Sequence, residues 1–225
     1  MAKNNIIIDN EHRYWNGAMR VPGVSEIIQS AGCSYIPDKS GDALLSAIED
    51  GLEDAEKYGI PGVSRGHIVE YIDKARRFGT AVHKAVYLFN SDNLKKETLD
   101  VNLLPYLNSW RQFVRDYGFI GEAGEELVYS EQWNFAGTLD CRGKIRKTRK
   151  VIIDVKTTHK IQASSAIQLE LYDIASGGGH IKLVVLLGPD GYEVKEYSDA
   201  GTKSVAISAI QIFNWKKKNN LLKGW

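Results

Sequence analysis

Three short stretches of the chain decide the fold: GTLD at residues 137–140, VIIDVKT at residues 151–157 and QLELY at residues 168–172. The first two are typical of strands. In an extended strand alternate residues share a face, so Asp154 and Lys156 would point to the same side. The other side would carry an apolar row suited to packing under a helix: Val151, Ile153 and Val155. The pattern predicts a buried strand that holds an acid and an amine towards one point.

The third stretch has helical spacing. Gln168 and Tyr172 are four residues apart and would lie on one side of a helix expected over residues 163–175, before the glycines at 177–179. At this stage the two side chains are equally compatible with facing solvent or a neighbouring helix.

The rest of the chain changes from helical to strand-like periodicity near residue 120. We expect a hairpin and then a helix within residues 5–30, with Ser25 as a candidate N-cap. Further helices are expected over 42–57, 64–90, 101–117 and 204–219, and strands over 126–131, 135–145, 181–187 and 192–197. The order β-β-β-α-β-β-α after the helices predicts an α/β fold, a mixed sheet flanked by helices. We expect one domain over residues 1–225, with 1–120 mostly helical and 121–225 the β-rich core.

The composition is that of an ordinary globular protein: 43% of the residues are hydrophobic, and the net charge is only +1. A nucleic-acid partner would therefore have to be held by local basic patches. Two cysteines are too few for a disulfide framework, and there is no apolar signal region or membrane-spanning run. We expect a soluble cytoplasmic protein, without a membrane partner, in a bacterium or a phage-infected cell.

Two strand-borne carboxylates, Asp140 and Asp154, beside Lys156 suit a hard divalent cation with oxygen ligands, Mg²⁺ or Mn²⁺. Phosphodiester hydrolysis can use open positions on such a cation for a nucleophilic water and a phosphate oxygen, and it needs positive charge where the transition state gathers negative charge. Lys156 can orient or deprotonate the water, or neutralise the phosphate. An Asp-x-Lys triplet is by itself more often a surface ion pair, but the apolar neighbours in this strand argue against that interpretation.

These motifs, in this order, resemble the PD-(D/E)xK nuclease superfamily, and specifically its RecB-like exonuclease branch. The GTAVH stretch at residues 79–83 is similar to the Gly-x-x-x-His helix motif that precedes the strands in that branch. Residues 21–28, VPGVSEII, resemble a segment near the start of phage and mitochondrial exonucleases of this group. The resemblance implies a restriction-endonuclease-like fold.

The resemblance also implies roles for individual residues. His83, Asp140, Asp154 and the backbone carbonyl of Val155 would ligate the metal, and Lys156 would be the catalytic lysine. Gln168 and Tyr172 would line the catalytic site. The helix after His83 lacks the acidic residue common one turn later, and we expect Glu126 or Glu131 as candidates to replace it. The sequence has no cysteine cluster for an iron–sulfur centre and no nucleotide-binding glycine loop.

The candidate DNA-binding segment is the densest basic run of the sequence, Lys144, Arg146, Lys147, Arg149 and Lys150. The alternative interpretation of this run is a solvated hairpin tip. We expect a metal-dependent DNA exonuclease that acts on linear single- or double-stranded ends in recombination, repair or replication. A phage is a candidate source of such an enzyme. The rival functions are a structure-specific or restriction-like endonuclease, and an inactive nuclease fold that only binds DNA or a protein. A recombinase or a single-strand-binding protein is the candidate protein partner, and ring oligomerisation would favour a processive exonuclease.

Overall fold

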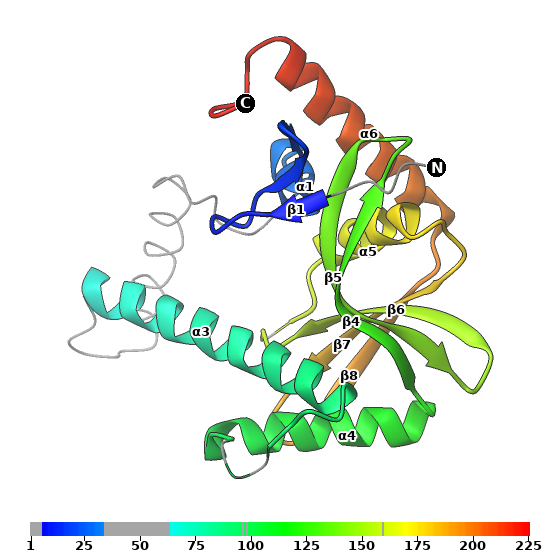
Figure 1. The fold of residues 1–225 in the computed structure, drawn as a ribbon. Helices are drawn as coiled ribbons and strands as arrows, with labels where there is room; N and C mark the ends of the chain where they lie inside the picture. The colour runs from blue at the N-terminus through cyan, green and yellow to red at the C-terminus, as the bar shows by residue number, and fades with distance from the viewer. Residues whose placement is uncertain (1–5, 34–63, 96, 98, 159) are drawn as a thin grey trace.

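The computed structural model describes residues 6–33, 64–95, 97, 99–158 and 160–225. A mixed sheet with helices on both faces forms the centre of this part of the chain (Figure 1), so the predicted α/β fold is confirmed. The helix expected over residues 42–57 lies outside the described residues. Among the described helices none is long and apolar enough to cross a bilayer.

The central sheet has the strand order β4-β5-β6-β7-β8. Its strands are β4 Ile120–Ser130, β5 Phe135–Ile145, β6 Arg149–Lys156, β7 Ile181–Leu187 and β8 Tyr192–Tyr197. Only β6 and β7 are parallel, while the other neighbours are antiparallel. Parallel strands need a crossover connection, and here the helix α5, Ser164–Ala175, provides it. The crossover brings α5 back over the sheet.

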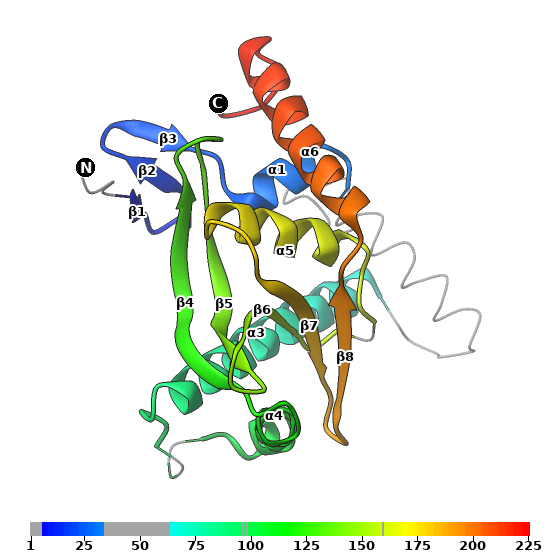
Figure 2. The same cartoon turned by 90° about the vertical axis from the view of Figure 1, so that its right-hand side faces the viewer.

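Strand β6 is buried on both faces because separate groups of helices cover the two sides of the sheet (Figure 2). One group is α3, Arg65–Asn90, and α4, Leu104–Tyr117, and the other is α1, Val24–Ser30, with α5 and α6, Ala200–Lys218. The apolar row predicted for β6 packs against the first group, on side chains such as Trp110 and Phe113. Ile152 packs on the other side, with α5 and α6. A central strand buried on both faces holds its polar residues in a fixed position.

A second, three-stranded antiparallel sheet packs on the far ends of β4 and β5. It consists of β1 Ile6–Ile8, β2 Tyr14–Asn16 and β3 Met19–Val21. The small sheet contacts the long strands through buried residues: Tyr14 of β2 and Val21 of β3 pack with Ala136 of β5. β1 to β3 therefore stand beside the region where β5 extends beyond β6.

Several expected boundaries are wrong. Ser25 lies inside α1, because Gly23 is the N-cap and its N–H donates to the carboxylate of Glu26 at 2.8 Å. The helix expected from residue 101 begins with a 3₁₀ turn, η2 Val101–Leu103, before α4. Strand β4 begins before the expected residue 126 and α6 before residue 204. The connection between β5 and β6 is shorter than expected, because β6 already begins at Arg149, within the basic run.

Gly143 on β5 is a position where the fold tolerates no side chain. A Cβ atom there would lie 2.1 Å from the carbonyl oxygen of Ile120 and 2.8 Å from the ring of Phe119. We expect Gly143→Ala to lower the free energy of unfolding by about 1–3 kcal/mol, because backbone must move to accept the methyl group. Denaturant unfolding measures this change.

Gly121→Ala is the matched control, since a Cβ atom at Gly121 would have no neighbour nearer than 3.6 Å. We expect a change within about 0.5 kcal/mol for the control. Equal unfolding free energies for the two variants would contradict the close approach of β4 and β5.

Candidate active site

The site forms where β5 and β6 part. Their pairing ends at Cys141 and Ile153, whereas the parallel pairing of β6 with β7 continues to Lys156. Beyond that point β5 supplies a side-chain acceptor in place of a backbone one. Oδ2 of Asp140 accepts a hydrogen bond of 2.8 Å from the backbone N–H of Val155. The hydrogen bonding between β5 and β6 thus finishes at a carboxylate, and this contact fixes Asp140 beside the end of β6.

Asp154 is a buried carboxylate with an incomplete set of partners. Only 2% of its side chain is exposed, and its Oδ1 accepts a hydrogen bond of 2.9 Å from Nζ of Lys156. Its Oδ2 is buried without any hydrogen-bond partner among the described residues. An unpaired buried carboxylate oxygen is destabilising, so this atom is a natural place for a cation.

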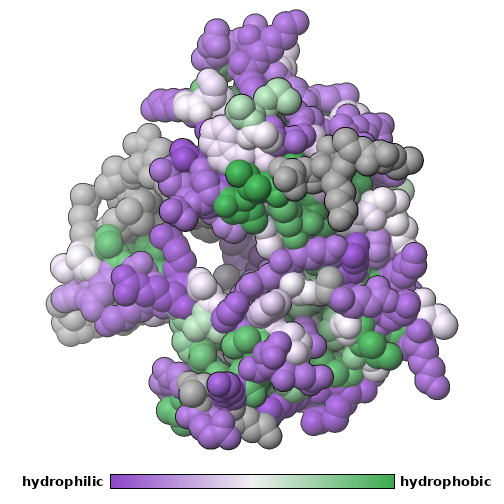
Figure 3. Space-filling view, viewed as in Figure 1, coloured by the Kyte–Doolittle hydropathy of each residue, from purple (hydrophilic) through white to green (hydrophobic). Residues whose placement is uncertain are grey.

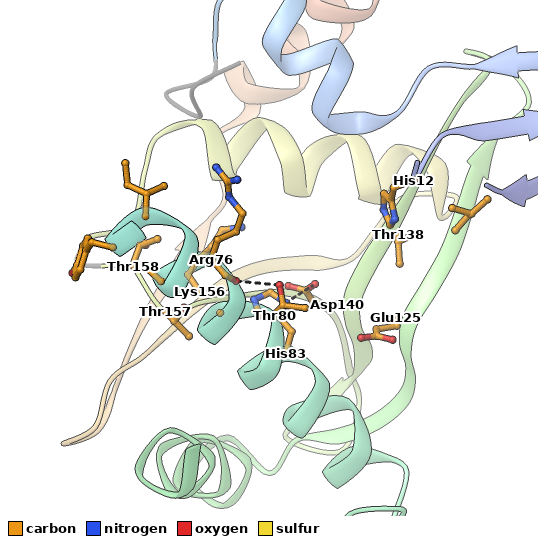
Figure 4. A pocket seen from close by; sticks show the side chains of 15 residues that line it. His12, Arg76, Thr80, His83, Glu125, Thr138, Asp140, Lys156, Thr157 and Thr158 are labelled. Carbon is orange, nitrogen blue, oxygen red and sulfur yellow. Dashed lines mark hydrogen bonds and ion pairs between the residues drawn. The ribbon is translucent and has the colours of Figure 1, made fainter. Parts of the chain in front are cut away.

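His83 reaches the same place from α3. Its Nδ1 lies 3.2 Å from Oδ1 of Asp140, and both side chains are partly buried. Close approach of α3 to the end of β6 depends on Gly79, where a Cβ atom would lie 3.2 Å from Oγ1 of Thr157. Figure 4 shows His83 and Thr80 on α3 close to Asp140 and Lys156.

Helix α5 supplies the remaining predicted residues. Nζ of Lys156 lies 3.5 Å from Oε1 of Gln168, whose Nε2 donates to the hydroxyl of Tyr172 at 3.3 Å. The Tyr172 side chain is buried and packs against β5 at Gly137, where a Cβ atom would lie 2.6 Å from its ring. The structure therefore brings Gln168 and Tyr172 into one chain of contacts with Lys156.

Burial and mutual charge shift the pKa values of these groups in different directions. Burial raises the pKa of Asp154 to about 6, and the nearby charge of Asp140 adds to this while Lys156 opposes it. For Asp140 burial acts to raise the pKa, but the hydrogen bond and charge of His83 outweigh it, so the pKa is lowered. Burial acts to lower the pKa values of His83 and Lys156, yet the carboxylates raise both. Lys156 is therefore an ammonium ion at neutral pH.

The donor atoms fit a hard divalent cation in chemistry. Asp154 offers an unpaired oxygen, each oxygen of Asp140 accepts a single hydrogen bond, and the main-chain carbonyl of Val155 belongs to the same strand end. Within the described residues, however, no three His, Cys, Asp or Glu side chains gather closely enough to hold an ion by themselves. His83 is hydrogen-bonded to Asp140 instead of converging with both aspartates. A cation here would thus depend on backbone oxygen and water as well as side chains.

A cavity of about 880 Å³ opens onto Asp140, His83 and Lys156. In Figure 3 the surface is hollowed between α3 and the part of the molecule that contains β1. Sequence reasoning missed several lining residues: Tyr71, Glu125 and His12. Figure 4 shows Glu125 and His12 around the predicted residues. The signal for one wall was available, since residues 71, 75, 79 and 83 follow one another at intervals of four, on one helical face.

The predicted basic segment lies elsewhere. Arg146 and Lys147 form the β5–β6 turn, at the opposite end of β6 from Lys156, and no residue of the segment lines the cavity. Lys144 pairs with Glu122 at 2.7 Å, and Arg149 lies 4.0 Å from Glu196. The segment's role in DNA binding stays a prediction.

The structure corrects the acidic candidates, Glu126 on β4 and Glu131 just after it. Glu126 pairs with Arg142 at 2.6 Å, and neither Glu126 nor Glu131 lines the cavity. Glu125 does line it, next to Asp140 on the neighbouring strand, and it has a positive φ of 49°. Its carboxylate lies 3.6 Å from Lys84.

Comparison with known proteins supports the fold and leaves the chain without an assigned family. No protein-family model and no curated protein matches the sequence. A solved structure from Eubacterium rectale, described as a candidate exonuclease, aligns with a TM-score of 0.50 at 12% identity, over 90% of this chain and 83% of that chain. LHK-Exo, an alkaline exonuclease from Laribacter hongkongensis solved in complex with dAMP, aligns with a TM-score of 0.46 at 13% identity, over 89% and 93%. At such identities the likeness to the Eubacterium rectale protein concerns the fold alone.

The raised pKa of Asp154 predicts a pH-dependent effect of Asp154→Asn. A shift from 3.8 to about 6 corresponds to about 3 kcal/mol of preference for the protonated form in the folded state. Because the folded state binds this proton more tightly than the unfolded chain does, the wild-type protein loses stability as the pH rises from about 4 through 6. The asparagine variant has no such proton to lose.

We therefore expect the free energy of unfolding of Asp154→Asn, relative to that of wild type, to increase by about 1–3 kcal/mol between pH 4 and pH 7. Urea unfolding at both pH values, in metal-free buffer, measures this difference. The exposed Asp190→Asn is the control and should show no trend. A difference between Asp154→Asn and wild type that stays constant with pH would contradict the buried, proton-holding carboxylate.

Proposed function

We propose that this protein is a metal-dependent DNA nuclease of the PD-(D/E)xK type, an exonuclease that hydrolyses phosphodiester bonds at linear ends. The observation that carries the proposal is the buried Asp154, with one unpaired oxygen, next to an ammonium ion and a second carboxylate at the edge of a cavity. Recombination, repair or replication, of a phage or its host, is the proposed setting.

The proposed cofactor is Mg²⁺ or Mn²⁺, held by Asp140, Asp154 and the carbonyl of Val155, with His83 as a further ligand. When bound, such an ion neutralises phosphate charge and makes water a better nucleophile at neutral pH. The role of the protein is to hold these oxygens on two neighbouring strands, β5 and β6, which the hydrogen bond from the Val155 N–H to Asp140 connects. For Nδ1 of His83 to ligate the ion, its contact with Oδ1 of Asp140 would have to give way, because a ligating ring nitrogen needs its lone pair free.

Lys156 acts as a cation in this proposal. Its raised pKa keeps the ammonium charged at neutral pH, which suits neutralisation of the scissile phosphate rather than removal of a proton from water. Asp154 and Gln168 hold the ammonium in place at 2.9 and 3.5 Å. Tyr172 orients Gln168 through its hydroxyl group, and burial raises the pKa of Tyr172 well above its usual range, so the hydroxyl stays protonated.

The fold adds a weaker kind of support. The Eubacterium rectale protein of the same fold is described as a candidate exonuclease. One fold can host many functions, so this likeness is an analogy, and the site itself has to carry the argument.

Degradation of DNA tests the proposal directly. End-labelled linear DNA and closed circular DNA are incubated with Mg²⁺ or Mn²⁺ and wild type, Asp154→Asn, Lys156→Ala or the control Lys203→Ala, an exposed position on α6. We expect wild type and the control to degrade only linear DNA, and the two site variants to lose activity by at least about 100-fold, because each removes charge stabilisation at the phosphate. Cleavage of circles would indicate an endonuclease, and no cleavage by folded wild type would indicate a binding module.

Binding of the ion has a readout that needs no substrate. An ion that binds only the folded state raises the melting temperature, by mass action. We expect millimolar Mn²⁺ to raise the melting temperature of wild type and of the surface control Asp190→Asn, and to leave that of Asp154→Asn unchanged. Scanning calorimetry makes the measurement, and equal shifts in all three proteins would place the ion away from Asp154.

A further inference from the structure

One wall of the cavity is a stripe along α3 that the proposed chemistry does not use. Tyr71, Ile72, Ala75 and Arg76 line the cavity together with Gly79, Thr80 and His83, which follow them on the same helix. From Tyr71 to His83 the stripe spans twelve residue steps, about 18 Å along the helix axis. At about 3.4 Å per nucleotide of a stacked strand, that length matches roughly five nucleotides.

The far end of the stripe presents an aromatic ring to solvent. Tyr71 is 64% exposed, on the part of α3 that precedes the helix residues buried in the core, Val82, Ala85 and Val86. Ile72 and Ala75 continue the apolar surface towards the site. Across the cavity stands Ile8 of β1, 40% exposed, beside His12 in the β1–β2 turn. The mouth of the cavity is therefore apolar and aromatic, whereas the other end is ionic.

The charges on α3 are sorted between its faces. On the outer face the basic residues are neutralised within the helix, with Lys74 on Glu70 and Arg77 on Asp73, each at 2.7 Å. Arg76 lies on the cavity side and forms no ion pair with any described residue. Figure 4 shows its side chain on the same side as Lys156. A cation that lines a cavity next to the proposed phosphate-cleaving site, and that has no ion-pair partner among the described residues, is matched by a phosphate group.

We propose that the α3 stripe binds the DNA end as a single strand, with a base stacked on Tyr71 and a backbone phosphate on Arg76. The proposal rests on the nuclease function and specifies its substrate as an unpaired strand. The occupant follows from the surface, because an exposed ring and a free cation in continuity with the site are what a strand with unpaired bases requires. In a duplex the bases are paired and stacked on both faces except at the terminal pair, so the apolar stripe beyond Tyr71 has no further base faces to meet.

Binding without cleavage separates the two proposals. Wild type and variants are titrated with a fluorescent single-stranded oligonucleotide and a blunt duplex of the same sequence, in EDTA, at several salt concentrations. We expect wild type to prefer the single strand. Tyr71→Ala should weaken single-strand binding by about 5- to 150-fold with the salt slope unchanged, because stacking carries no counterion release. Tyr71→Phe should restore binding.

Arg76→Ala should weaken binding and also reduce the slope of log K against log salt by about 0.7, the value for one phosphate contact on a single strand. Matched controls on other faces of α3 are Val69→Ala for the apolar change and Lys74→Ala for the charge change, and both should bind like wild type. Replacement of one base near the strand end by 2-aminopurine gives a second readout, since its fluorescence should be quenched by wild type and much less by Tyr71→Ala.

Equal binding of Tyr71→Ala and wild type, or a preference for the duplex, would overturn the strand-binding proposal even where Mg²⁺-dependent cleavage is intact. Strand binding that depends on Tyr71 and Arg76 in a protein that never cleaves DNA would support the strand site and overturn the nuclease proposal. The two failures thus give different results.

Discussion

Burial of Asp154 at the end of a strand covered on both faces is the constraint on which the rest of the site depends. An isolated carboxylate is unfavourable there, and the pKa raised to about 6 expresses that cost. Lys156 compensates one oxygen, and the other has no partner among the described residues. The buried carboxylate of β6 is thus preorganised to bind a cation. The hydrophobic cores on both faces of the strand hold the carboxylate in this position.

The neighbouring elements are shaped by the need to approach this strand end. Gly79 allows α3 to bring His83 next to Asp140, and Gly137 leaves room on β5 for the ring of Tyr172. Both glycines are required by close contacts rather than by backbone conformation, because neither has a positive φ. The parting of β5 from β6 then opens the cavity, whose α3 wall extends well beyond the catalytic residues.

The sequence predicted the parts of this arrangement that follow from local periodicity. Strand alternation placed Asp154 and Lys156 on one face, and helical spacing placed Gln168 beside Tyr172; contacts in the structure connect all four. Contacts between distant segments had no local signal. The pairing of Glu126 with Arg142 and the entry of Glu125 into the cavity depend on the register of β4 against β5, which a bulge after Gly121 shifts. The basic turn was conspicuous in sequence but lies at the other end of the sheet.

Location of the metal ion tests the central claim most directly. Crystals of the protein grown with Mn²⁺ give an anomalous signal that marks the ion independently of any assumed ligand. The account predicts a peak within coordination distance of the free oxygen of Asp154, with Asp140 and the carbonyl of Val155 as further ligands, at about 2.0–2.3 Å. A protein that cleaves DNA with Mn²⁺ but binds the ion away from Asp154, or keeps Asp154 paired only with Lys156, would contradict the account.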